Sequence, residues 1–437
     1  MKKNHQKENR RSFIRDKLWK GILFAITGSL PTIARATADQ EHLPTAIYTA
    51  DGETIDWDKV KRMFTLAAKR HHFNTASISP SPKVVQDKTI ETIHYLNRFG
   101  SEEHKRVEPV RLKLGQLLNA PPTQLAITRN TTEGMNIIAR SLGLQKGDEV
   151  IITNQEHVGG AAPWLTLQNE IGIGVTVIDI AENEENTCSL LERAITPRTK
   201  AISVSHITCT TGAVLPVKDV IVLCKKHGVQ SVIDGAQAVG QIPVDLGYLN
   251  PDFYAASGHK WLYGPNGTGI LYLNKDFLMN TGPLFSGAYT DRIFDINAGL
   301  IDYVQSASRY EYGTLNAPIM AGLGAAVDFI QNIGTVRVTD RCKQLSTRFY
   351  MGIKGHKNIT ILTPEKEKLR AAIVTFRISD KQSAEVCRLL VKGGVTVLRH
   401  VHENNLNAIR ASFAIFTSEE EVDELIARIL LLAEANE

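Results

Sequence analysis

Seven short apolar runs, rich in β-branched residues, alternate with helix-like segments through the middle of the chain. They lie at residues 125–128, 150–153, 175–178, 201–204, 231–233, 253–255 and 269–273. Strands that are apolar along their whole length are typical of a sheet covered on both faces, and helices are the usual connections between parallel strands. The pattern therefore predicts an α/β fold with a seven-stranded, mostly parallel sheet.

Helical spacing of apolar residues also fills positions 84–118, ahead of the first predicted strand. The pattern changes after Thr314. Two helices are predicted there, at 317–330 and then up to about Met351, followed by strands at 360–362, 372–376, 395–398 and 409–412 and an amphipathic helix from Ser418. These elements predict a smaller α+β domain over 316–437, which residues 39–80 join, beside a large domain over 81–315.

The first 38 residues differ from the rest of the chain. The pair Arg10 and Arg11, closely followed by Phe13, precedes a short apolar run at 21–30 and small residues at 34–38. This order is typical of a removable signal peptide, and the paired arginines resemble a twin-arginine signal, which predicts export to the periplasm by the twin-arginine translocase. The run is too short and too weakly apolar to span a bilayer, so no stable membrane anchor is expected. A basic amphipathic N-terminal helix is the weaker alternative, because the small residues suit a cleavage site.

The leader also accounts for the basic charge of the chain. Residues 1–36 hold nine Lys/Arg and two acidic residues, a net charge of +7, while the formal charge of the whole chain is +4. The remainder therefore carries about −3, and no nucleic-acid partner is expected. Five cysteines, odd in number and without a CxxC pair, predict neither a disulfide framework nor a metal site.

A lysine stands just beyond the sixth predicted strand, in the sequence Ala-Ser-Gly-His-Lys-Trp at residues 256–261. Lys260 there can bind an aldehyde cofactor covalently, provided that an anion site and a carboxylate that polarises the cofactor lie nearby. By itself the stretch is more typical of a surface lysine in a turn. The interpretation therefore depends on the residues that stand just beyond the other strands.

Polar residues follow several of these strands. Thr131 and Thr132 open a helix, where hydroxyls, free N–H groups and the helix dipole favour an anion. His157 follows the second strand and can stack on a flat aromatic cofactor. Asp234 follows the fifth and can keep a pyridine nitrogen protonated, which leaves Gln237 to bond the ring's phenolic oxygen. The plainer alternatives are a helix N-cap, a loop histidine and an Asp-Gly turn.

The carboxyl ends of parallel strands meet at one edge of a sheet, where ligands of such folds bind. The coincidence of these motifs at successive strand ends therefore favours one cofactor site over unrelated turns. Ser257 and His259, beside Lys260, complete the set.

In chain order these motifs resemble the class V aminotransferase family of pyridoxal-phosphate (PLP) enzymes, over nearly all of the chain after the leader. The resemblance implies an aspartate-aminotransferase-type fold (fold type I), pyridoxal 5'-phosphate as cofactor and a homodimer with sites at the subunit interface. It implies that Lys260 carries the cofactor and moves protons, and that Asp234 faces the pyridine nitrogen. His157 would stack on the ring and Gln237 would contact the phenolate. The phosphate would be held by Thr131, Thr132, Ser257 and His259.

Two later segments extend the resemblance. Residues 309–314 resemble the segment in which Thr314 reaches the phosphate of the other subunit. Residues 409–412 resemble the segment whose arginine, here Arg410, binds the substrate carboxylate, a bidentate task suited to guanidinium. The alternative for Arg410 is a salt bridge on a strand of the small domain.

The sequence departs from the family's cysteine desulfurases, which carry a nucleophilic cysteine on a loop ahead of that arginine. Residues 399–407 contain none, and Cys387 lies in a helical stretch where burial is expected, so desulfuration is not expected. Cys209 stands where desulfurases have a ring-contacting asparagine, and a packed side chain is favoured over a reactive thiol. The loop with His400 and His402 resembles the isopenicillin-N-epimerase branch, and the leader resembles periplasmic members of that branch that modify siderophores such as pyoverdine.

The expected function is an exported PLP enzyme that acts at the α-carbon or amino group of an amino acid or peptide-like metabolite, first of all as an aminotransferase with Lys260 as general base. In the alternative, an epimerase, Lys260 and an acid from the loop with His400 and His402 exchange a proton on opposite faces. A catalytically silent cofactor-binding protein is the alternative from another class, against which Lys260, Asp234 and Arg410 together argue. The twin-arginine route carries folded proteins, which suits a chain that must capture its cofactor before export.

Overall fold

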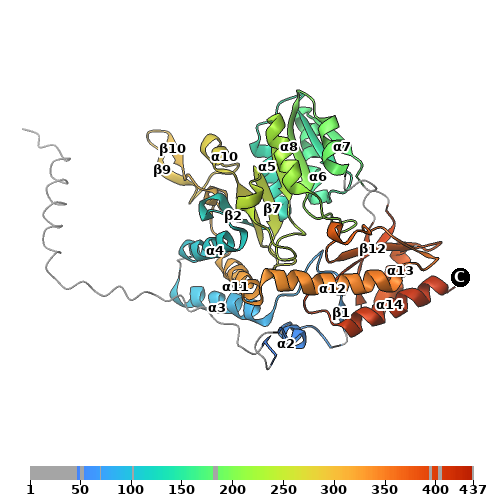
Figure 1. The fold of residues 1–437 in the computed structure, drawn as a ribbon. Coiled ribbons are helices and arrows are strands. Elements are labelled where there is room, and N and C mark those ends of the chain that lie inside the picture. Colours follow the sequence, from blue (N-terminus) through green and yellow to red (C-terminus); the bar gives the residue numbers. More distant parts are fainter. Residues whose placement is uncertain are drawn as a thin grey trace, which may run out of the picture. The chain divides into compact units, whose positions relative to one another are not determined.

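A seven-stranded sheet forms the central layer of the structure, a computed structural model (Figure 1). The strand order is β2-β8-β7-β6-β5-β3-β4, and β8 runs antiparallel to both its neighbours while the other pairs are parallel. The strands are β2 (Leu125–Thr128), β3 (Glu149–Thr153), β4 (Gly174–Ile178), β5 (Thr199–Ser205), β6 (Gln230–Asp234), β7 (Phe253–Ser257) and β8 (Gly269–Leu273). The predicted α/β fold with a mostly parallel sheet of seven strands is confirmed.

The structure describes residues 47–49, 54–68, 70–100, 103–180, 186–392, 396–401 and 406–435. The predicted export signal at 1–38 and His402 lie outside the described residues.

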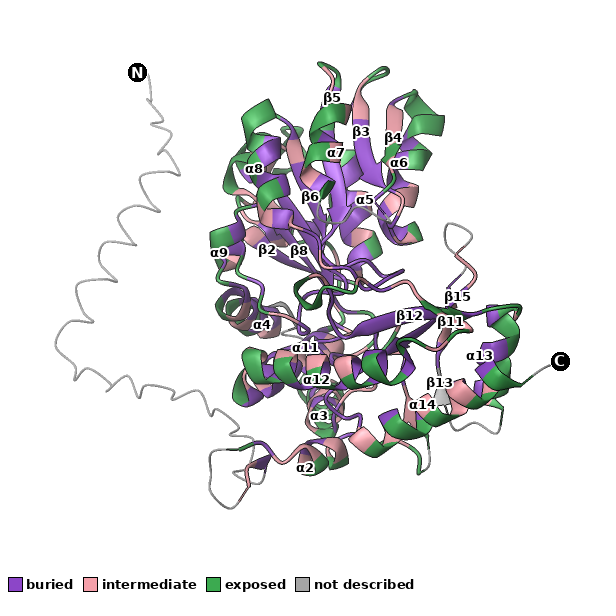
Figure 2. Ribbon diagram, turned by 45° about the vertical axis from the view of Figure 1, so that its right-hand side comes forward, coloured by how far each residue is buried: buried purple, intermediate pink, exposed green. Residues whose placement is uncertain are grey.

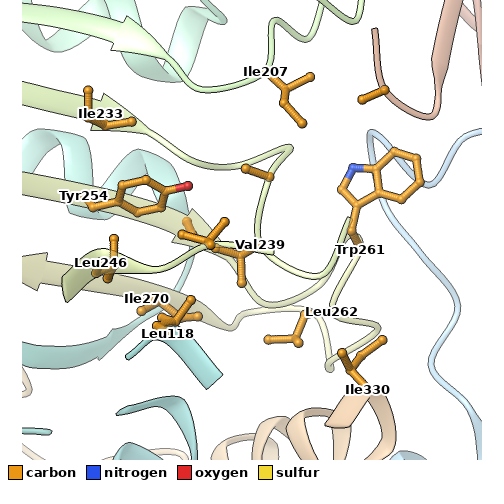
Figure 3. Close-up of a cluster of buried hydrophobic side chains, with 14 of the residues drawn as sticks. Leu118, Ile207, Ile233, Val239, Leu246, Tyr254, Trp261, Leu262, Ile270 and Ile330 are labelled. Carbon is orange, nitrogen blue, oxygen red and sulfur yellow. The ribbon is translucent and has the colours of Figure 1, made fainter. Parts of the chain in front are cut away.

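Helices cover both faces of the sheet, and successive strand residues enter two different cores (Figure 2). Val232 packs into the core beneath α5 (Thr131–Ser141), whereas its neighbour Ile233 packs into the opposite core with Tyr254 and Trp261 (Figure 3). The remaining helices between strands are α6 (Val158–Ile171), α7 (Thr187–Ala194), α8 (Val217–His227) and α9 (Leu246–Leu249). Burial on both faces explains why the strands are apolar without alternation.

The predicted helical region at 84–118 is two helices, α3 (Lys83–Phe99) and α4 (Glu103–Leu118). Gly100 ends α3 at a φ of 78°, a positive value that glycine adopts readily because it has no Cβ. Helix α11 (Ala317–Ile333) packs against both, and α12 (Thr335–Ile353) follows. No single helix of the described chain is long and apolar enough to cross a membrane. Helices α11 and α12 are long and apolar enough to cross a membrane only when they are taken together, and the pair is bent by 80°.

A second sheet of four antiparallel strands has the order β11-β12-β15-β14. Its strands are β11 (Ile359–Ile361), β12 (Ile373–Ile378), β14 (Arg399–Val401) and β15 (Ala408–Ser412), and its helices are α13 (Ser383–Val391) and α14 (Glu419–Glu434). The predicted strand at 395–398 differs: β13 (Thr396–Val397) pairs with β1 (His71–His72), and the chain enters the four-stranded sheet only at Arg399. Pairing with a segment more than 300 residues away leaves no trace in the local pattern.

The segment after β1 continues into the second sheet. The N–H of Ser412 donates to the carbonyl of Phe73 at 2.9 Å, and the ring of Phe73 meets the ring of Phe413 edge to face. The domain boundaries proposed from the sequence, at 38/39, 80/81 and 315/316, stay predictions.

A hairpin of β9 (Asp291–Asp295) and β10 (Leu300–Tyr303) was not predicted from the sequence. Most of its residues are exposed, so the alternation of a half-buried strand is missing. The other short elements are α2 (Trp57–Arg62), α10 (Lys275–Asn280), η2 (Pro122–Gln124), η4 (Ala307–Tyr310) and η5 (Glu367–Leu369).

Candidate active site

A pocket of about 560 Å³ lies beyond the carboxyl ends of β2, β3, β6 and β7. This is the edge at which doubly wound sheets bind ligands. Of the ten site residues predicted from the sequence, eight line this pocket and two, Thr314 and Arg410, do not. The eight, called the strand-end wall below, are Thr131, Thr132, His157, Asp234, Gln237, Ser257, His259 and Lys260.

Lys260 is the amine of the pocket. It follows β7, whose last residue Ser257 is buried in the sheet, so the strand fixes where the lysine begins. Burial lowers the pKa of Lys260 from 10.5 to about 8, the carboxylate of Asp234 opposes this change, and the positive charges of Arg410 and Arg399 add to it. A lysine with this pKa has a sizeable neutral fraction near neutral pH, as a nucleophile or general base requires.

Asp234 is the last residue of β6 and is buried. Its Oδ1 accepts the N–H of Ala236 at 2.8 Å, which holds the carboxylate in one orientation. Burial raises the pKa of Asp234, and the Ala236 N–H and the charge of Lys260 oppose the rise. A cationic ligand nitrogen would also lower the pKa of Asp234 and so stabilise its carboxylate form.

A second buried carboxyl group, Glu156, lies behind this acid. It accepts hydrogen bonds from the hydroxyls of Thr153 and Ser205, each at 2.6 Å. A Cβ added to Gly160 would lie 3.1 Å from Asp234 Oδ2 and 3.7 Å from Glu156 Oε2, so both carboxyls face the same small space. Burial raises the pKa of Glu156 to about 7, the two hydroxyls oppose the rise, and the charge of Asp234 adds to it. No role for Glu156 was predicted from the sequence.

Hydroxyl groups gather at the start of α5. The hydroxyl oxygens of Thr131 and Ser257 lie 2.6 Å apart, and Asn130 caps the helix by accepting the N–H of Glu133. A Cβ on Gly159 would lie 2.3 Å from Thr132 Oγ1, so only glycine leaves this part of the pocket open. Hydroxyls and free N–H groups at the start of an 11-residue helix form a site for an anion.

The two histidines of the wall are held by the backbone. His157 caps α6, and its Nδ1 accepts the N–H of Gly159 at 3.0 Å, which leaves the proton of the neutral ring on Nε2. His259 lies 3.0 Å, through Nδ1, from the carbonyl of Thr268, so Nδ1 is its donor. Burial lowers the pKa of His259, which favours a neutral ring.

Gln237 is oriented by two neighbours. Its Oε1 accepts the indole N–H of Trp261 at 2.8 Å, and its Nε2 donates to the carbonyl of Ala76 at 2.8 Å. The second hydrogen on Nε2 can therefore serve a ligand oxygen, the role expected from the sequence.

Arg410 lies on β15, fully buried behind the pocket. Its guanidinium donates to the carbonyl of Cys209 at 2.8 Å, to Ser77 Oγ at 2.7 Å and to Asn74 Oδ1 at 3.3 Å. Ser77 itself lines the pocket, so it stands between Arg410 and the cavity. These neutral oxygens hold the guanidinium in place.

Several lining residues were missed in the sequence. Arg399 begins β14 and is half-buried, although the sequence placed it in a loop. Ala76, Ser77 and Ile78 come from the N-terminal segment, and the other missed residues are Arg129, Asn130, Gly159, Ala236, Asn266 and Gly267. No local motif marks Arg399. Side chains alternate between the two faces of a strand, so only the pairing of β14 with β15 could have shown that Arg399 lies on the same face as Arg410.

The remaining candidates lie outside the pocket. Thr314 precedes α11 and does not line the cavity of its own chain, so its role toward a partner subunit stays a prediction. Cys209 and Cys387 are buried, and burial raises the pKa of the Cys387 thiol to about 12. His400 lies on β14 without lining the pocket.

This donor set fits pyridoxal phosphate. The hydroxyls at the start of α5 suit a phosphate, Lys260 suits an aldehyde, and the Asp234 carboxylate suits a protonated ring nitrogen. When bound, the cofactor supplies an electron sink for bonds at the α-carbon of an amino acid.

Comparison with known sequences supports this assignment. The sequence profile of the family described as aminotransferase class-V matches residues 81–425. A cysteine desulfurase of Serratia proteamaculans is 28% identical over 396 residues, which cover 85% of this chain and 96% of the relative. A cysteine desulfurase of Yersinia pestis is 28% identical over 377 residues, covering 82% and 91%.

Solved structures show the same fold. A C-DES variant with glycine covalently linked to its PLP cofactor has a TM-score of 0.79 at 26% identity, covering 86% of this chain and 99% of that one. The cystine C–S lyase C-DES in complex with its reaction product, cysteine persulfide, has a TM-score of 0.78 at 26% identity, covering 85% and 99%. The desulfurase CsdA of Escherichia coli has a TM-score of 0.78 at 24% identity, covering 87% and 99%, a likeness of fold.

Proposed function

The chain belongs to the class V aminotransferase family of PLP enzymes, and from this premise we propose that it acts at the α-carbon and amino group of an amino acid or a peptide-like metabolite as an aminotransferase-type enzyme. One observation carries the proposal. The pocket sets a lysine of lowered pKa, Lys260, beside the buried acid Asp234, with the guanidinium of Arg410 behind Ser77.

Each of these groups has a task that its surroundings suit. Lys260 would hold the cofactor and would take and return the proton of the substrate α-carbon. Asp234 keeps the ring nitrogen protonated. Arg410 binds the α-carboxylate, for which a planar guanidinium with several donors is well matched. His157 and Gln237 orient the ring from positions that the backbone and Trp261 fix.

Epimerisation is the alternative reaction on the same residues. It requires a second acid on the face of the substrate opposite Lys260, and the loop containing His400 and His402 is the source we propose. Transamination instead requires a keto acid as a second substrate, which receives the amino group.

Cleavage of a C–S bond is a second candidate, which the desulfurase relatives and the cystine C–S lyase among the structural neighbours favour. Transfer of sulfur to a cysteine on the loop ahead of Arg410 lacks its acceptor, because residues 399–407 contain no cysteine. C–S cleavage here would therefore release its sulfur product into solution.

We further propose that residues 1–38 direct export through the twin-arginine translocase to the periplasm, on the strength of Arg10, Arg11 and the small residues at 34–38. A homodimer, in which Thr314 of each chain reaches the partner's phosphate site, is proposed from the family resemblance. Replacing Arg10 and Arg11 by lysine should keep the protein in the cytoplasm, and unchanged export would contradict the signal.

One experiment separates the reactions. Purified holoenzyme is incubated with a panel of amino acids, with and without 2-oxoglutarate, while cofactor absorbance, α-proton exchange by NMR and products are followed. Keto acid formed only with the acceptor supports transamination, inversion without acceptor supports epimerisation, and pyruvate with released sulfur supports C–S cleavage. Holoenzyme that binds amino acids without any exchange or product would leave only the catalytically silent binding protein.

A further inference from the structure

Two carboxyl groups, Glu156 and Asp234, lie beside each other at the ends of three neighbouring strands and are called the acid pair below. The Glu156 oxygens accept the hydroxyl of Thr153 at 2.6 Å and both the hydroxyl and the N–H of Ser205, at 2.6 and 3.2 Å. Ser205 ends β5 and is the register partner of Asp234, the last residue of β6. Such partners extend from the same face of a sheet, so the hydroxyl that holds Glu156 stands next to Asp234.

The acid pair is buried, and a glycine leaves the space between the two groups open. Glu156 is 7% exposed and Asp234 is 5% exposed. A Cβ on Gly160 would lie 3.1 Å from Asp234 Oδ2 and 3.7 Å from Glu156 Oε2, so both oxygens border the space that this glycine leaves. Two negative charges in such a site repel each other, and burial together with the charge of Asp234 raises the pKa of Glu156 to about 7. Near neutral pH the acid pair therefore holds a proton that it can release.

Other titratable groups stand around the acid pair. Lys260, after β7, acts on Asp234 through its charge. Tyr254 on β7 lies 2.9 Å, through its hydroxyl, from Nδ1 of His206, which follows β5. Burial raises the pKa of Tyr254 and lowers that of His206 to about 4, so both groups stay neutral between pH 5.5 and 8. His157, next to the pair in the chain, lines the pocket.

We propose that Glu156 is a positioning residue for the cofactor, which acts through Asp234: it releases its proton when a protonated ring nitrogen binds, and its charge then strengthens the binding of that ring. The ring cation beside Asp234 relieves the repulsion within the acid pair, so both carboxyls can be ionised together. The O–H bond of Glu156 breaks, and its proton passes to the solvent. This role rests on the cofactor site of the proposed function, with Asp234 at the ring nitrogen, and not on which bond of the substrate reacts.

Titration of the full-length apoprotein with pyridoxal 5'-phosphate tests this role without any turnover. Affinities of the wild type and of Glu156→Gln are measured at several pH values and compared as a ratio. Lys260, His157 and the cofactor titrate in both proteins, so the ratio isolates Glu156. We expect the ratio of wild-type to variant affinity to rise about 3- to 10-fold from pH 5.5 to pH 8, as one added charge behind Asp234 requires. Calorimetry in two buffers at pH 7 should show that the wild type releases more protons than the variant.

A second variant and a control sharpen the test. Ser205→Ala keeps the carboxyl of Glu156 but removes one of its donors, so the rise should move to higher pH, whether or not Glu156→Gln folds. Glu385→Gln, an exposed glutamate on α13, should follow the wild type at every pH.

A ratio that stays flat with pH in Glu156→Gln, or an unmoved profile in Ser205→Ala, would overturn the proposal. So would the same rise with the 1-deaza analogue of the cofactor, whose ring has no nitrogen to protonate. If the ratio rises as expected but no amino acid reacts, the proposed function fails while the role of Glu156 stands.

Discussion

The strand-end wall and the two arginines that the four-stranded sheet places at and behind the pocket, Arg399 and Arg410 (the small-sheet wall), are held in place in different ways. Each residue of the strand-end wall ends or follows a strand or opens a helix, and near neighbours in the chain help to orient it, as Ala236 orients Asp234 and Trp261 orients Gln237. Arg410 on the small-sheet wall instead depends on Asn74 and Ser77, more than 330 residues earlier in the chain.

This contrast separates the residues proposed to bind the cofactor from those proposed to bind the substrate. The strand-end wall supplies the groups that suit the cofactor, and its residues lie at the carboxyl edge of the seven-stranded sheet. In the proposed function Arg410 of the small-sheet wall binds the substrate, and its strand is short. We therefore expect a change there to alter substrate binding without removing the cofactor site. Four predictions test these roles and the buried groups on which they depend.

Lys260→Ala should have the largest effect, because it removes both the covalent anchor and the proton-transfer group. We expect turnover to fall by at least about 10³-fold. The measurement is kcat/KM on the best substrate, with mass analysis after borohydride reduction, which should show the cofactor adduct in the wild type alone. Lys275→Ala, an exposed lysine on α10, is the control. Full turnover in Lys260→Ala would remove the basis for all three enzymatic proposals.

Arg410→Met comes second and should leave the cofactor adduct intact. We expect KM for the amino acid to rise by about 10²-fold, the usual order when one partner of a buried charged pair is truncated. The unfolding free energy should fall by about 1–3 kcal/mol, because the Cys209 carbonyl and Ser77 lose a buried donor. Michaelis constants and urea unfolding measure the two effects. An unchanged KM would mean that the α-carboxylate binds elsewhere.

Glu156→Gln tests the buried carboxyl group behind the strand-end wall. The pKa of Glu156 is raised from 4.5 to about 7 in the folded protein, so the folded state keeps a proton that the unfolded state releases. Wild-type stability therefore falls as pH rises through this window, a loss that glutamine avoids. Between pH 5 and 8 the variant should gain about 2 kcal/mol relative to the wild type. Urea unfolding at both pH values measures this, with the exposed Glu385→Gln as control. A pH-independent difference would contradict the raised pKa.

The smallest effect concerns cofactor capture by the apoprotein. Only neutral Lys260 attacks an aldehyde, and its pKa of about 8 means that the neutral fraction grows as pH rises. The second-order rate of PLP capture should increase about 10-fold from pH 7 to 9 and then level off. Stopped-flow absorbance follows the reaction. A rate that keeps rising toward pH 10.5 would indicate a lysine without the burial described here.

Local pattern was enough to predict the strand-end wall. Residues around Val232 and Ile233 fill two cores, so their strand is apolar throughout, and Asp234 stands out as the first charged residue after it. Thr131, His157 and Lys260 stand out in the same way, because each is a polar residue a few positions after an apolar strand. Each signal is contained in a dozen residues, and the topology of a parallel sheet brings the ends together.

The small-sheet wall could not be predicted in this way. Arg410 came only from the family resemblance, and Arg399 was placed in a loop because the apolar run before it belongs to β13, which pairs with β1. Ser77 gave no sign that it would line the pocket. All three depend on contacts between distant segments, and such contacts leave no periodicity in the sequence.

The hydrogen bond from Ser412 to Phe73, and those from Arg410 to Asn74 and Ser77, join the two ends of the folded unit. A nascent chain lacks β15 until residues 408–412 have been made, so before then the lining supplied by residues 76–78 lacks the support that Arg410 and Ser412 give it. Vitamin B6 capture is therefore expected to be a late event, after β15 has joined its sheet.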